Sequence, residues 1–197
     1  MPLAGTAPGH PERKVMIELS LFLVFSAGLV ALSWRFLRLR RTHGFYRFFA
    51  FECLLALTML NAERWFRDPF SLPQMASWLL LAGSIALAVH GFHLLVRVGK
   101  PARICGREEE LGIEATTTLV TVGAYRYIRH PLYASLLCGA WGAFLKHVTV
   151  FSFLLAVAVS AFLTATAKVE EGENLRKFGD SYAAYMKKTK MFLPFVV

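Results

Sequence analysis

Residues 131–167 read PLYASLLCGAWGAFLKHVTVFSFLLAVAVSAFLTATA, and Lys146 is the only one of them with a formal charge. A helix that crosses a bilayer needs about 20 mostly apolar residues, whereas a helix on a soluble surface carries many charges. Lys146 and His147 mark the place where this long apolar stretch divides in two. The stretch therefore predicts a helical hairpin, with one helix over 131–146 and the next over 149–167.

The same pattern recurs toward the N-terminus. Residues 19–34 and 69–96 contain no Lys, Arg, Asp or Glu, and 56% of the chain is hydrophobic. A soluble domain of this length needs more polar surface than that. The fold expected is therefore an all-α integral membrane protein with about five transmembrane helices. Before the hairpin, these helices are expected over 16–37, 45–62 and 74–96.

The organisation expected is a single membrane domain over 15–197, with its motifs in 100–197. Residues 1–14 contain Pro and Gly, and we expect them to be flexible. Glu52 lies inside the second apolar run, and a carboxylate at that depth is expected to face protein rather than lipid.

Charge predicts how the chain is oriented. With the N-terminus outside and the C-terminus cytoplasmic, 17 of the 22 Lys and Arg residues fall on the cytoplasmic side and five fall outside. The net charge of +9 lies beside apolar runs, which indicates contact with anionic membrane lipids rather than with nucleic acid. The three cysteines are widely spaced, and their spacing excludes a CxxC metal site.

The segment from Thr117 to Tyr133 carries the most chemical information. Pro131 is suited to the first turn of a helix, which leaves Arg129 and His130 at the helix N-terminus. Free N–H groups, the helix dipole and a guanidinium together form an anion site, which would fit the carboxylate of an amino-acid-like cofactor. Tyr125, Tyr127 and Tyr133 could contact a nucleoside; alternatively, the Arg and Tyr side chains only anchor the helix at the membrane interface.

A second polar segment follows the hairpin and begins with Glu170 and Glu171. Two carboxylates at a helix end near the membrane need water or a cationic partner, and solvation alone is the simpler alternative. Leu175, Phe178, Tyr182 and Tyr185 then repeat at helical spacing, which predicts a C-terminal amphipathic helix in the membrane interface. This helix is expected either to close over a cofactor or to pack on a neighbouring chain.

The order of these motifs resembles the isoprenylcysteine carboxyl methyltransferase family and its phospholipid methyltransferase relatives. The matching residues cover about the C-terminal half: Leu119-Val120, Gly123-Ala124-Tyr125, Arg129-His130-Pro131-Leu132-Tyr133, Glu170-Glu171, Phe178-Gly179, Tyr182, Tyr185 and Pro194. The resemblance implies an enzyme that uses S-adenosylmethionine. The cofactor-binding residues expected are Glu110, Thr117, Thr118, Leu119, Val120, Tyr125, Arg129, His130, Pro131, Leu132, Tyr133 and Glu170. Glu110 belongs to the run Glu108-Glu109-Glu110, for which a solvated acidic loop is the alternative.

The methyl group of this cofactor is activated by its positive sulfur, so the enzyme mainly has to orient a nucleophile and exclude water. Glu170 and Glu171 are the catalytic candidates, because a thiol, hydroxyl or amine acceptor would need a base. The acceptor expected is hydrophobic or lipid-tailed and is methylated at the cytoplasmic face. Family members that methylate prenylcysteine carry an arginine where this chain has Thr166, so an acceptor other than a prenylated protein C-terminus is expected.

Two other functions are compatible with the sequence. Membrane sterol-type reductases that use NADPH share a related Arg-His and Tyr element, although their pattern has Asn-Tyr where this chain has Leu132-Tyr133. His90 and His93 lie one turn apart and could hold haem or quinone in a non-enzymatic membrane subunit. A polar contact between helices is the simpler interpretation of these two histidines.

Overall fold

A computed structural model describes residues 10–38, 42–99 and 116–194 of the chain. Within these ranges the regular structure is helical, with isolated bridges in place of strands. The elements are α1 (His10–Arg38), α2 (His43–Leu60), η1 (Ala62–Arg64), α3 (Leu72–Val98), η2 (Gly123–Arg126), α4 (Pro131–Lys146), α5 (Val150–Phe178) and α6 (Asp180–Lys188).

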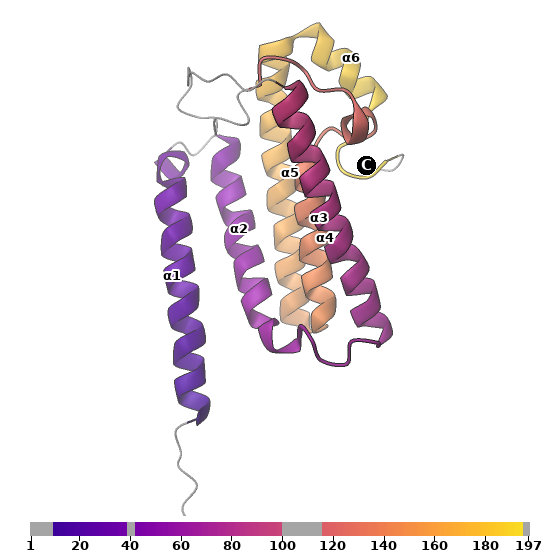
Figure 1. Cartoon of the computed structure of the whole chain (residues 1–197). Helices are drawn as coiled ribbons and strands as arrows, with labels where there is room; N and C mark the ends of the chain where they lie inside the picture. The colour runs from indigo at the N-terminus through magenta and orange to yellow at the C-terminus, as the bar shows by residue number, and fades with distance from the viewer. Residues whose placement is uncertain (1–9, 39–41, 100–115, 195–197) are drawn as a thin grey trace, which may run out of the picture.

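The five long helices lie side by side, and α6 lies across one end of them (Figure 1). α3 packs mainly against α4 and α2 mainly against α5, while α1 stands at the edge and contacts α2. We call the end crossed by α6 the pocket end, because it contains the pocket described below. There α3 and α5 finish and α2 and α4 begin, so short segments from distant parts of the sequence meet.

Small side chains let the helices approach closely. Ala140, Ala156 and Ala167 are fully buried. A Cβ added to Gly142 on α4 would lie 3.0 Å from Leu81 on α3, and the Ser77 hydroxyl donates to the Gly142 carbonyl at 2.7 Å. In lipid, the hydrophobic effect does not drive helices together. Close van der Waals packing and hydrogen bonds between the helices stabilise the bundle instead.

A polar network closes the end opposite the pocket. Lys146 is only 4% exposed; its Nζ donates to Gln74 Oε1 at 3.0 Å and lies 3.4 Å from the centroid of the Trp78 ring. The Asn61 amide donates to the Ala143 carbonyl at 2.8 Å. Through these contacts, the turn between α2 and α3 and the first turn of α3 pack against the end of α4, where the hairpin of α4 and α5 turns.

The apolar segments predicted from the sequence are helices. Three of them, Val15–Arg38, Leu72–Val98 and Val150–Phe178, are long and apolar enough to cross a membrane. α2 and α4 are shorter, with 18 and 16 residues. The prediction of an all-α membrane protein is confirmed at this level.

The C-terminal segment differs from the prediction in one respect. α5 continues 11 residues beyond position 167, because residues 168–178 are mostly good helix formers without proline. Gly179 ends it with a φ of 57°, a conformation that glycine adopts at little cost. The amphipathic repeat therefore spans two helices, with Leu175 and Phe178 at the end of α5 and the two tyrosines on α6.

Candidate active site

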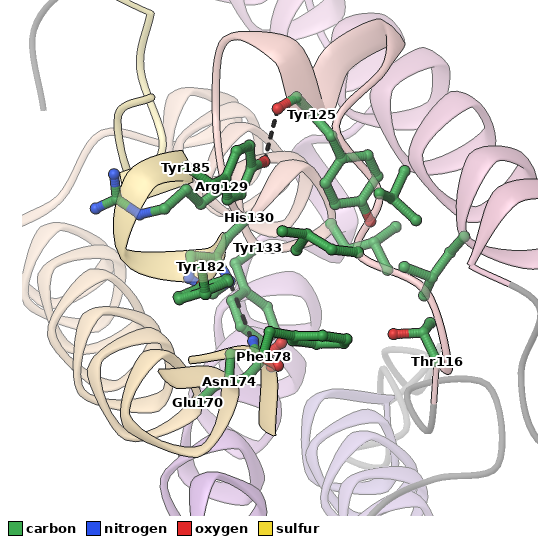
Figure 2. Close-up of a pocket in the computed structure, with 14 residues that line it drawn as sticks. Thr116, Tyr125, Arg129, His130, Tyr133, Glu170, Asn174, Phe178, Tyr182 and Tyr185 are labelled. Carbon is green, nitrogen blue, oxygen red and sulfur yellow. Dashed lines mark hydrogen bonds and ion pairs between the residues drawn. The ribbon is translucent and has the colours of Figure 1, made fainter. Parts of the chain in front are cut away.

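A pocket lies at the pocket end of the bundle, between the end of α5, the start of α4, η2 and α6 (Figure 2). The pocket has a volume of about 90 Å³. The lining mixes aromatic, aliphatic and polar side chains. They are Leu95, Thr116, Leu119, Val120, Tyr125, Arg129, His130, Leu132, Tyr133, Glu170, Asn174, Phe178, Tyr182 and Tyr185.

Gly123 and Pro131 fix the backbone of the segment before α4, which forms one side of the pocket. Gly123 has a φ of 61°, a conformation that other residues rarely adopt, and it lies close to the Leu94 and His90 side chains of α3. The Ala124 N–H donates to Nε2 of His90 at 3.3 Å. Pro131 begins α4 as predicted, with His130 as the N-cap residue.

Arg129 holds α6 against the bundle. Its Nε donates to Oε1 of Glu171 at 2.6 Å, and Nη1 donates to the carbonyls of Met186 at 3.3 Å and of Thr189. The side chains of Arg129 and Glu171 are 10% and 9% exposed. The guanidinium points away from the cavity (Figure 2), toward the protein rather than toward the cofactor carboxylate that the sequence led us to expect.

The two adjacent glutamates have different surroundings. Glu170 lines the pocket, is 27% exposed and accepts a 2.6 Å hydrogen bond from the Tyr133 hydroxyl. The His130 ring stacks on Tyr133, with its Nδ1 3.9 Å from Glu170 and its Nε2 3.4 Å from Glu171. The latter separation is an ion-pair distance without hydrogen-bond geometry. Glu170 is therefore the carboxylate available to a ligand, while Glu171 stabilises Arg129.

Tyr182 and Tyr185 on α6 line the pocket. The Tyr185 hydroxyl donates to the Tyr125 carbonyl at 2.6 Å, which joins α6 to η2 (Figure 2). Asn174 hydrogen-bonds with the Tyr182 hydroxyl. Burial raises the pKa of both tyrosines above the ordinary value, so both hydroxyls stay protonated well into the alkaline range.

Eight of the residues expected at the cofactor line this pocket: Leu119, Val120, Tyr125, Arg129, His130, Leu132, Tyr133 and Glu170. Thr117 and Thr118 are exposed beside the lining, where their N–H groups donate to the Gly99 carbonyl. Pro131 is buried at the start of α4. Glu110 lies outside the described residues.

Sequence reasoning missed Leu95, Thr116 and Asn174. Asn174 had a usable signal, because it follows Glu170 by four residues and precedes Phe178 by four, so all three share one face of α5. Leu95 and Thr116 had no such signal. They reach the pocket because the end of α3 packs beside η2.

The polar residues inside the apolar runs make contacts between elements. His90 accepts from the η2 backbone, while His93 lies on another face of α3. Glu52 on α2 accepts a hydrogen bond from Ser26 on α1, with the two carboxylate oxygens 3.0 and 2.9 Å from the hydroxyl. These contacts favour the simpler interpretation of His90 and Glu52.

The fold is that of an α-helical membrane protein, and a pocket lies at one end of its bundle. The phospholipid methyltransferase family model matches residues 74–181, more than half of the chain, and the chain belongs to this family. The predicted resemblance to membrane methyltransferases is confirmed.

Two relatives with similar sequences are named as methyltransferases. Over 79 residues the chain is 34% identical to a protein-S-isoprenylcysteine O-methyltransferase of Schizosaccharomyces pombe, covering 40% of this chain and 34% of that protein. Over 70 residues it is 27% identical to methanethiol S-methyltransferase 1 of Bradyrhizobium diazoefficiens, covering 36% of this chain and 24% of the relative. The chain thus spans between about a quarter and a third of the length of these curated relatives.

Proposed function

We propose that this chain transfers a methyl group from S-adenosylmethionine to a hydrophobic or lipid-tailed acceptor at the cytoplasmic face of a membrane. The observation that carries the proposal is the Glu170 carboxylate, held by Tyr133 in an aromatic-walled pocket at one end of an apolar bundle. The family supports methyl transfer, and the relatives' names specify isoprenylcysteine and methanethiol as acceptors. These names do not favour a sterol-type reductase or a haem subunit.

The chemistry of the lining fits this cofactor. Glu170 offers a negative charge to a sulfonium or an ammonium group, and Tyr125 and Phe178 offer ring faces to an adenine. When bound, the cofactor would supply an electrophilic methyl group to the acceptor's lone pair and would leave as a neutral sulfide.

The residues of this chain then orient the reactants and exclude water. Arg129 and Tyr185 hold α6 over the pocket, which keeps solvent from the reacting atoms. Glu170 is the candidate base for an acceptor that must lose a proton, since Glu171 is engaged by Arg129. Glu171 is thereby a positioning residue rather than the second catalytic carboxylate expected from the sequence.

The acceptor prediction concerns Thr166. This side chain is fully buried and its Oγ1 donates to the Phe162 carbonyl at 2.8 Å, so position 166 offers no cation to a carboxylate. We expect the wild type to methylate an alkyl thiol at least about tenfold more efficiently than N-acetyl-farnesylcysteine, because an arginine–carboxylate pair contributes about 1.5–3 kcal/mol. Transfer of labelled methyl from S-adenosylmethionine measures both rates.

Farnesylcysteine as the better acceptor would contradict the inference from Thr166. The Thr166→Arg variant is a poor test, because a long charged side chain in this fully buried position would destabilise the bundle. Absence of labelled methyl on thiols, amines, hydroxylated lipids and farnesylcysteine alike would contradict the proposed function.

In the membrane, we propose that residues 15–197 form one domain with five spans, the N-terminus outside, and α6 in the cytoplasmic interface. Cys105, which lies outside the described residues, should then react with an impermeant maleimide only from the cytoplasmic side. Cys53 and Cys138, half-buried in α2 and α4, should stay protected. Labelling of inside-out and right-side-out vesicles measures this, with Cys105→Ser as control; reaction of Cys105 from outside would reverse the topology.

A further inference from the structure

The end of the bundle opposite the pocket, which we call the far end, carries large apolar side chains on its outer surface. It consists of the turns from α2 to α3 and from α4 to α5, with the first residues of α3 and α5. Turns that face water are normally polar, whereas a large exposed apolar patch marks a contact with a membrane or a partner. Six apolar side chains of the far end are between 59% and 89% exposed: Phe66, Phe70, Leu72, Val148, Val150 and Phe151.

The end of α4 obtains its hydrogen bonds from protein rather than from water. The last four carbonyls of a helix have no partner within the helix, and at an aqueous surface water can satisfy them. Here the Ala143 carbonyl accepts from the Asn61 amide at 2.8 Å. The Lys146 carbonyl accepts from the Gln74 amide at 3.1 Å. Such replacement of water by protein donors is what a chain segment surrounded by lipid requires.

The charge at the end of α4 also faces the protein. The Lys146 side chain is 4% exposed, and its ammonium group donates to Gln74. The same group lies 3.4 Å from the centroid of the Trp78 ring and 5.5 Å from that of Trp65. A lysine beside water extends its flexible stem toward the solvent, because the ammonium group is strongly hydrated. An ammonium group held inward by an amide and two indole rings therefore indicates apolar surroundings outside the far end.

The helices give a reference for depth. α1 lies beside α2, and its first turn extends past the far end (Figure 1). The part of α1 that is apolar enough to cross a membrane begins at Val15, so its charged start marks the approach to water. α2 and α4 have 18 and 16 residues. They rise about 27 and 24 Å, less than the roughly 30 Å hydrocarbon thickness of a bilayer.

We propose that the far end is an interaction surface for membrane lipid. Its two turns lie in the interfacial layer of the leaflet farther from the pocket, with their apolar side chains among the acyl chains and not in the water beyond. The exposed Arg67 in the same turn is placed to meet lipid phosphates. Lipid is favoured over a protein partner because the surface continues onto the sides of α3 and α5, where Leu79 and Leu154 are 74% and 57% exposed.

The test places a nitrobenzoxadiazole fluorophore on one cysteine of the full chain in lipid nanodiscs. The variants Phe70→Cys and Phe151→Cys are made in a chain whose own thiols are removed by Cys53→Ala, Cys105→Ser and Cys138→Ala. Nitroxide on the upper acyl chain reports contact with lipid, and iodide reports contact with water. We expect the nitroxide lipid to quench both probes at least about twofold, because side chains at the interface reach the boundary between headgroups and acyl chains.

Asp180→Cys is the matched control, since Asp180 is an exposed residue at the start of α6, at the pocket end. Iodide should quench this probe at least about threefold more strongly than the probe at Phe70, because ions stay out of the apolar layer. Equal quenching by iodide at the two positions overturns the inference. Protection of the Phe70 and Phe151 probes from both quenchers also overturns it, because a protein partner or a second copy would then cover the far end.

The cysteine variants are expected to fold, because the Phe70 side chain is 89% exposed and makes few contacts within the protein. Thermal unfolding of each labelled variant checks this. The two positions come from different turns, so agreement between them reports on the far end as a whole.

Discussion

The Arg129→Ala variant is expected to melt about 6–20 °C below the wild type and to lose measurable cofactor binding. Removing one partner of a buried ion pair costs about 3–5 kcal/mol, because the other charge is left uncompensated. Here that charge is Glu171, and two carbonyls at the end of α6 lose their donor as well. Thermal unfolding in detergent measures the first effect and titration with S-adenosylhomocysteine the second.

Two variants separate this explanation from a general loss of charge. Arg126→Ala removes an exposed arginine three residues earlier and should leave the melting temperature near that of the wild type. The Arg129→Ala/Glu171→Ala double variant should be more stable than Arg129→Ala alone, because no buried charge remains unpaired. If Arg129→Ala has the same melting temperature as Arg126→Ala, the Arg129 guanidinium does not hold α6 against the bundle.

The Glu170→Gln variant should bind S-adenosylhomocysteine about 10- to 150-fold more weakly, which corresponds to the loss of about 1.5–3 kcal/mol from a charged hydrogen bond. The variant keeps the size of the side chain and removes only the negative charge that faces the pocket. Tyr133→Phe should weaken binding in the same direction, since the hydroxyl that orients this carboxylate is lost. Calorimetric dissociation constants measure both.

Glu173→Gln is the matched control for this prediction. Glu173 lies on the same helix but contacts Nδ1 of His43 at 2.7 Å instead of lining the pocket. Its neutral variant should keep the wild-type affinity for the cofactor. Equal losses in the two variants would indicate a nonspecific effect of charge at the end of α5.

Much of the fold follows from local sequence. In lipid, a long charge-free segment can form all of its backbone hydrogen bonds within itself only as a helix. The site is predictable where one short segment builds it, as from Tyr125 to Tyr133, because Gly123 and Pro131 dictate the backbone there. The roles of Glu170 and Glu171 were not predictable. Adjacent residues on a helix point about 100° apart, and the rotation of α5 is set by its packing on α2 and α4.

The role of Arg129 was also not predictable from local sequence. Its position at the start of a helix favoured an anion site, but its partners Glu171 and Thr189 come from segments 42 and 60 residues further along the chain. Only the folded structure brings these groups together. α5 also continued past the predicted membrane boundary, because charged residues end a membrane span without ending a helix.

The proposed function requires that the pocket around Glu170 binds S-adenosylmethionine. The most direct measurement is a calorimetric titration of S-adenosylhomocysteine into the purified wild-type chain in detergent. We expect saturable binding at one site per chain, weakened at least about tenfold in Glu170→Gln and unchanged in Glu173→Gln. Folded wild-type protein that gives no binding heat at any temperature tested, or binding that Glu170→Gln leaves intact, would contradict it.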